Sequence, residues 1–163
     1  MKDPKQLKRK IKFLIILFMA GLILSGLTAF PLETELGILN STAIAHLSPD
    51  NPVYVWINSI YKALQETNRN YPYLAYGTDW LAFAHLVIAA AFIGPLRDPV
   101  RNIWVIEFGM VACLMVFPLA LIMGPVRDIP MFWRIIDCSF GVVGILPLLL
   151  CRRYIHQLSQ SKA

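Results

Sequence analysis

Charged residues are scarce in this chain. Asp, Glu, Lys and Arg make up 15% of its 163 residues, whereas soluble domains carry about 25%. Hydrophobic residues reach 57%, and the mean hydropathy is +0.58. The low charge content argues against an ordinary soluble domain, and the long apolar runs predict a membrane protein.

Cysteine and histidine are also rare, and the motifs of several enzyme classes are missing. Cys113, Cys138 and Cys151 lie in apolar runs with no CxxC spacing, which is typical of buried thiols and not of a disulfide framework. No GxSxG, HExxH or glycine-rich phosphate loop occurs, so these hydrolase, zinc-protease and nucleotide-binding classes are not indicated. We predict no cofactor; a haem or metal site at His46 and His85 is a weak alternative.

Four apolar stretches are long enough, or nearly so, to cross a bilayer. A hydrocarbon core of about 30 Å needs about 20 apolar residues, and the stretches are residues 11–30, 79–95, 100–123 and 130–151. They predict an all-α polytopic membrane protein, a four-helix bundle that forms one domain over residues 1–163. The first stretch is longer than the apolar core of a signal peptide, so we interpret it as an uncleaved span.

The distribution of cations predicts the orientation of the chain. If the N-terminus is inside, the outer side receives only four of the 15 Lys and Arg residues, namely Lys62, Arg69, Arg127 and Arg134. The positive-inside rule therefore places both termini in the cytoplasm. We expect the protein to reside in a cell membrane, and a bacterial inner membrane is the leading location. The net charge of +5 follows from this asymmetry and from attraction to anionic lipids, so no nucleic-acid partner is indicated.

The segment between the first two spans, residues 31–78, is predicted to be an extracytoplasmic helical cap. Its second half has the apolar spacing of an amphipathic helix, with Val53, Trp56, Ile57, Ile60, Tyr61 and Leu64 on one face. Asn51 and Pro52 supply a start signal for this helix. A weaker helical pattern runs from Leu32 to Leu47. We expect the cap to lie on the outer membrane surface.

A turn is repeated 30 residues apart: GPLRDP begins at Gly94, and GPVRDIP begins at Gly124. Asp98 and Asp128 are predicted to cap the helices that follow, and the two glycines to end the preceding helices in the left-handed conformation. Because successive spans run in opposite directions, the copies form an inverted repeat. The similarity extends to Trp104 with Trp133 and to Glu107 with Asp137. Duplication and chance explain it about equally well.

Ionisable residues inside the spans are the candidate site, since each must face water or a partner. At a rise of about 1.5 Å per residue, His85 and Asp137 each lie about 9 Å from the outer boundary. Stripes of small residues accompany them and are expected to face inward; they are Thr78, Ala82 and Ala89 beside His85, and Gly141 and Gly144 beside Asp137. We predict that His85 donates or accepts a proton and that Asp137 orients it, as the two catalytic candidates.

Four further residues are predicted to bind a ligand: Arg134, Glu107, Trp80 and Trp133. Arg134 lies one turn from Asp137, where an i, i+3 ion pair can form. A purely structural alternative stays open, in which Arg134 and Asp137 neutralise each other and His85 donates to a backbone carbonyl.

The leading functional hypothesis is a small integral membrane protein that binds a hydrophobic or amphipathic small molecule. Its pocket would open to the outer leaflet and reach His85, and chemical conversion of the molecule is an extension of this hypothesis. One alternative is a non-enzymatic accessory subunit that docks on another membrane protein. A third is a proton-coupled transporter that acts as a homodimer and uses Glu107 and Asp137. The expected partners are membrane lipids and the small molecule, with a second membrane subunit under the alternatives.

Overall fold

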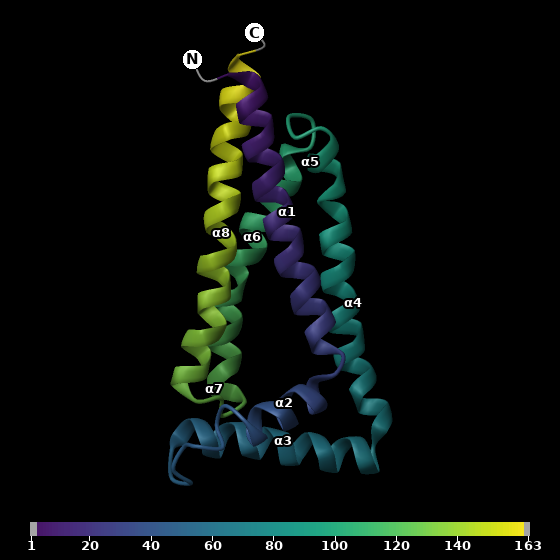
Figure 1. Ribbon diagram of the computed structural model, residues 1–163, viewed down its shortest axis with the longest axis vertical. Helices are drawn as coiled ribbons and strands as arrows, with labels where there is room; N and C mark the ends of the chain where they lie inside the picture. Colours follow the sequence, from purple (N-terminus) through teal and green to yellow (C-terminus); the bar gives the residue numbers. More distant parts are fainter. Residues whose placement is uncertain (1–2, 162–163) are drawn as a thin grey trace. The chain divides into compact units, whose positions relative to one another are not determined.

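The computed structural model describes residues 3–161, which contain helices and no strand (Figure 1). Four helical segments are long and apolar enough to cross a membrane, which agrees in number and position with the four predicted spans: Pro4–Ala29, Pro72–Arg97, Ile103–Val126 and Met131–Gln160. The chain divides into two compact units. Unit 1 comprises Met1–Gly21 and Ala89–Ala163, and unit 2 comprises Leu22–Ile88. The single-domain organisation stays a prediction.

Unit 1 is organised around an antiparallel helical hairpin. It contains the start of α1 (Pro4–Ala29), α5 (Ile93–Arg97), α6 (Ile103–Pro118), the π-helix η2 (Leu119–Met123), α7 (Gly124–Val126) and α8 (Met131–Gln160). A Cβ atom on Gly141 of α8 would lie 2.6 Å from the Cys113 carbonyl oxygen of α6. The two backbones therefore approach as closely as small residues permit in a membrane.

Helix α8 continues to Gln160, past the predicted end of its span at Cys151. Its 30 residues measure about 45 Å, against about 30 Å for the hydrocarbon core. A seam of buried side chains explains the extension: Leu148, Cys151, Ile155 and Leu158 on α8, and Leu7, Ile11 and Ile15 on α1. The Lys10 ammonium lies 5.7 Å from the centre of the Tyr154 ring, so α1 and α8 are in contact near the two termini (Figure 1).

Unit 2 contains the predicted helical cap. It comprises the end of α1, α2 (Leu32–Ser41), α3 (Pro52–Asn70), the 3-10 helix η1 (Pro72–Leu74) and α4 (Ala75–Ala91) as far as Ile88. Helix α3 begins as predicted, with Pro52 in its first turn and the Asn51 side chain accepting a hydrogen bond of 2.9 Å from the Val53 N–H. Ile57 on its apolar face is buried, which confirms the amphipathic pattern.

Helices α1 and α4 cross closely within unit 2. Gly26 is buried, and a Cβ atom there would lie 2.9 Å from the Ala82 carbonyl oxygen and 3.1 Å from the His85 Cβ. Ala82 has no exposed surface. The predicted stripe of small residues on α4 thus faces α1 at this crossing, where a larger side chain would hold the helices apart.

The two copies of the repeated turn are built differently. The Asp98 carboxylate accepts a hydrogen bond of 3.1 Å from the Arg101 N–H within the loop, but α6 begins at Ile103 after Asn102 and has no side-chain cap, so the predicted capping of the following helix by Asp98 is wrong. The capping role of Asp128 is wrong, because α8 begins after Pro130 with no side-chain cap. Asp128 instead adopts φ 52°. Its N–H donates to the Pro125 carbonyl, and the Ile129 N–H donates to the Gly124 carbonyl, which is a Schellman motif with Asp128 as its left-handed residue.

The predicted role of the turn glycines is also wrong. Gly94 lies within α5 and Gly124 begins α7, and among residues 3–161 no glycine has a positive φ. Helix α4 already ends at Ala91, and Asp128 takes the left-handed position of the second turn. Gly124 provides space instead, since a Cβ atom there would overlap the Arg134 side chain.

Candidate functional site

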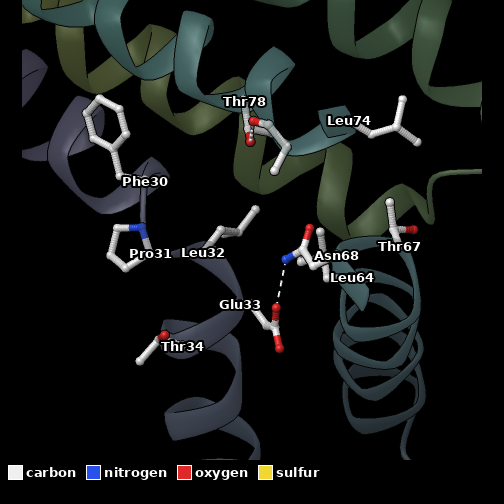
Figure 2. A pocket seen from close by; sticks show the side chains of 11 residues that line it. Phe30, Pro31, Leu32, Glu33, Thr34, Leu64, Thr67, Asn68, Leu74 and Thr78 are labelled. Atoms are coloured by element: carbon white, nitrogen blue, oxygen red, sulfur yellow. Dashed lines mark hydrogen bonds between the residues drawn. The ribbon is translucent and has the colours of Figure 1, made fainter. Parts of the chain in front are cut away.

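A cavity of about 310 Å³ lies in unit 2 (Figure 2). It is enclosed by the junction of α1 and α2, the C-terminal part of α3, and the start of α4 with η1 before it. Eleven residues line it: Phe30, Pro31, Leu32, Glu33, Thr34, Leu64, Thr67, Asn68, Leu74, Ala75 and Thr78. Its volume falls in the range of about 300–1,000 Å³ found for small-molecule sites.

Two proline-containing breaks in the helices create the space. Helix α1 ends at Ala29, and Pro31 immediately precedes α2. Helix α3 ends at Asn70, and Pro72 begins η1. The residue before a proline is disfavoured in the helical conformation, so each break redirects the chain beside the cavity.

A hydrogen bond between Glu33 and Asn68 forms the polar part of the cavity. The Asn68 side-chain amide donates to one Glu33 carboxylate oxygen at 2.7 Å, and Figure 2 shows the two side chains pointing toward each other from α2 and α3. Both residues are partly buried. Glu33 lies in the first turn of α2, where the helix dipole stabilises a negative charge. The bond therefore joins two helices and fixes the direction of the carboxylate.

Apolar side chains make up most of the remaining wall, with Phe30, Leu32, Leu64 and Leu74 among them. Thr78 adds a hydroxyl group that donates to the Ala75 carbonyl at 2.6 Å. Because its hydrogen is used in this bond, the Thr78 oxygen can only accept from a molecule in the cavity. The wall suits an apolar chain, and the Glu33–Asn68 pair suits a polar head.

The lining of this cavity does not include His85. The His85 Nδ1 atom lies 2.8 Å from the Leu81 carbonyl oxygen. Since a carbonyl only accepts, Nδ1 carries the hydrogen of this bond, and Nε2 is the ring nitrogen left to contact a ligand. This is the backbone bond that the structural alternative predicted for His85.

Trp80 lies in a ladder of aromatic rings on α4. Its ring meets those of Tyr76 and Phe83 edge to face, with centroids 5.9 Å apart in each pair. All three side chains are largely exposed, and Trp80 does not line the cavity. Such a ladder is typical of the aromatic belt at a membrane interface.

Glu107 forms an ion pair in unit 1. The Arg152 Nε atom of α8 donates to the Glu107 carboxylate of α6 at 2.9 Å. In the antiparallel hairpin, residues equally far from the turn face each other, which brings these two together. Their side chains are 45% and 44% exposed.

Arg134 does not form the predicted ion pair with Asp137, and that prediction is wrong. The Arg134 Nε atom donates to the Ile129 carbonyl at 2.8 Å, because the absent side chain at Gly124 lets the arginine fold back over the turn. Trp133, the neighbouring candidate, packs edge to face against Phe132 with ring centroids 6.4 Å apart.

Asp137 is partly exposed on α8. Within the part of unit 1 that the structure describes, it forms no hydrogen bond or ion pair within 4.0 Å. It lies four residues before Gly141, on the face of α8 that meets α6. His85 belongs to unit 2 and Asp137 to unit 1, so their pairing stays a prediction.

The weak metal alternative receives no geometric support. Across residues 3–161, no group of three or more His, Cys, Asp and Glu side chains is placed to hold a metal ion. His46 is exposed in the loop between α2 and α3, and His85 is engaged with its own helix.

Sequence reasoning missed Glu33, Asn68 and Arg152. The sequence did carry a signal for Glu33 and Asn68. Glu33 is an acidic residue at the start of the first cap helix, and Asn68 is an amide near the end of the second. These positions meet when the two helices pair antiparallel. Arg152 was counted only for orientation, although the antiparallel pairing of the two helices that flank the second repeated turn brings it to Glu107.

Comparisons with known proteins add no family. A scan against protein-family models and searches of curated proteins and of solved structures found no match to this chain.

Proposed function

We propose that this protein binds a small amphipathic molecule in the unit 2 cavity. The observation that carries the proposal is the composition of the lining, where six apolar residues accompany three threonines and one hydrogen-bonded carboxylate–amide pair. Ligand sites in proteins combine mostly apolar walls with a few oriented polar groups. The cavity is bounded by the ends of two membrane-spanning segments, which is where an amphiphile partitions.

We place the cavity on the outer side of the membrane, with both termini in the cytoplasm. The support is the excess of Lys and Arg on the other side of the spans. A bacterial inner membrane is the proposed location. In this proposal the cavity lining contacts the ligand. The residues first expected to do so are His85, Asp137, Arg134, Trp80, Trp133 and Glu107. Chemical conversion by His85 would then require Nε2, because Nδ1 is bonded to the Leu81 carbonyl.

Filling the cavity tests this function. Ala75 lines the cavity on α4, so Ala75→Trp should occupy its volume. Ala90 is exposed on the same helix, and Ala90→Trp is the matched control. Hexylamine, hexan-1-ol and hexanoate are titrated by calorimetry into protein held in phosphatidylcholine nanodiscs, with empty nanodiscs as the blank.

We expect saturable binding of at least one compound to the wild type and to Ala90→Trp, and its loss in Ala75→Trp. The function is contradicted if none of the three compounds binds saturably, or if Ala75→Trp binds as well as the control.

A docking subunit is the second candidate, favoured by one surface of α1. Gly21, Ser25 and Thr28 are exposed and lie on one face of that helix, and a Cβ atom on Gly21 would meet nothing within 4 Å. Small residues on an open face are typical of helix–helix contacts in membranes. Under this candidate, Gly21→Ile would abolish co-purification with a second membrane protein, and under the cavity function it would leave ligand binding unchanged.

A further inference from the structure

The cavity lining carries one formal charge. Glu33 is its only acidic residue, and no Lys, Arg or His belongs to the lining. A single negative charge in a partly buried, partly apolar lining favours a cationic ligand, because opposite charges attract more strongly where water is partly excluded. We propose that the bound amphiphile carries a protonated amine as its head group, which donates a hydrogen bond to Glu33. This proposal rests on the proposed function of the same cavity.

The bonding of Glu33 leaves capacity for such a donor. A carboxylate has two oxygens and about four lone-pair directions, and the Asn68 amide occupies one direction on one oxygen. The second oxygen has no hydrogen-bond partner among the residues that the structure describes. Asn68 also holds the carboxylate in place, so an arriving ammonium group meets an oriented acceptor. Such charge-assisted bonds are about twice as strong as bonds between neutral groups.

The start of α2 argues against an anionic head group. An uncapped helix N-terminus attracts anions through its unpaired N–H groups and its dipole, and Pro31 provides no side-chain cap here. However, Glu33 and Glu35 both lie in the first turn of α2. These two carboxylates already complement the dipole and would repel a phosphate or carboxylate ligand.

The volume limits the size of the bound part. At about 30 Å³ per water-sized group, the 310 Å³ cavity holds about ten non-hydrogen atoms. It therefore accommodates an amine with a short chain, or the head of a longer amphiphile whose tail extends into the bilayer. Leu32, Leu64 and Leu74 are the apolar side chains that would contact the chain.

The test compares compounds that share a six-carbon chain and differ only in the head group. Hexylamine, hexan-1-ol and hexanoate are titrated by calorimetry at pH 7 into wild-type protein in phosphatidylcholine nanodiscs. Both hexylamine and hexan-1-ol can donate a hydrogen bond to Glu33, but only the ammonium group adds the attraction between opposite charges. We therefore expect hexylamine to bind about tenfold more tightly than hexan-1-ol. Hexanoate should bind most weakly.

Two substitutions in the same helical turn separate the role of Glu33 from a general charge effect. Glu33→Gln keeps the shape and can still accept from Asn68, so the cavity should persist while the tenfold preference for hexylamine disappears. Glu35→Gln removes a negative charge two residues further along the chain, outside the cavity lining. This variant should retain the preference for hexylamine.

The outcomes distinguish the two proposals. If hexan-1-ol or hexanoate binds the wild type as tightly as hexylamine, and Ala75→Trp blocks that binding, the amine head group is refuted and the cavity function stands. The same conclusion follows if Glu33→Gln keeps the preference for hexylamine. If no compound binds, or if Ala75→Trp has no effect, both proposals are refuted.

Discussion

The crossing of α6 and α8 makes a quantitative prediction about Gly141. Replacing it with Ala adds a Cβ atom 2.6 Å from the backbone oxygen of Cys113, which is too close for any real contact. The obstacle is a backbone atom, so no side chain can rotate away and the helices must separate. Overpacking of this kind costs about 1–3 kcal/mol, and the gain in helix propensity from Gly to Ala offsets about 0.5–1 kcal/mol of it.

We therefore expect Gly141→Ala to lower the free energy of unfolding by about 1–2 kcal/mol. Gly21→Ala is the matched control, since a Cβ atom there meets nothing within 4 Å and only the propensity gain of about 0.5–1 kcal/mol remains. Both free energies are measured by titrating detergent-solubilised protein with sodium dodecyl sulfate and following circular dichroism. Equal effects of the two substitutions would refute the close crossing.

Three further predictions concern the turns, the ion pair and the orientation. Asp128→Gly should raise the free energy of unfolding by about 1 kcal/mol, because φ 52° costs a residue with a side chain about that much. Asp98→Ala should lower it by about 0.5–1.5 kcal/mol, because the hydrogen bond from the Arg101 N–H is lost; a stabilising Asp98→Ala would contradict the assigned roles. A double-mutant cycle of Glu107→Gln and Arg152→Gln should give a coupling of about 0–1 kcal/mol, since the pair is nearly half exposed and screened; a coupling above about 2 kcal/mol would mean that the pair is desolvated. In intact cells, a cysteine at Asn58 should react with a membrane-impermeant maleimide and one at Gln160 should not; the reverse pattern would invert the proposed orientation.

Much of the fold follows from patterns that act over one or two helical turns. The four spans follow from the length of the apolar runs, and the start of α3 follows from Asn51 and Pro52. The amphipathic face of α3 follows from its spacing, with Ile57 as its buried residue. These features depend on local rules, so the sequence is sufficient to predict them.

The conformation of the repeated turn could not be predicted from its own residues. The same five letters, Gly-Pro-aliphatic-Arg-Asp, produce a carboxylate that accepts from the Arg101 N–H at Asp98 and a left-handed residue at Asp128. The surrounding structure differs between the two copies. In the first copy Gly94 to Arg97 belong to helix α5, whereas in the second the Arg134 side chain folds over Gly124. A motif of five residues cannot encode which later side chain will pack on it.

The predicted site residues and the cavity depend on different kinds of structure. Rarity of charge inside the spans pointed to His85, Glu107 and Asp137, but Glu107 is paired with Arg152 and His85 with its own backbone. The cavity arises instead where two breaks in the helices come together, and its polar pair joins residues 35 positions apart. Such a contact depends on the pairing of α2 with α3, which single-sequence periodicity does not determine.

The central claim, that the unit 2 cavity binds an amphiphilic amine, is tested most directly by locating a bound probe. Crystals of the protein grown in a lipidic mesophase are soaked with 6-bromohexylamine, and the bromine is found by its anomalous scattering. We predict a bromine peak among Leu32, Leu64 and Leu74, with the amine nitrogen within hydrogen-bonding distance of the Glu33 carboxylate. A peak elsewhere in the protein, or an unoccupied cavity at saturating probe, would contradict the claim.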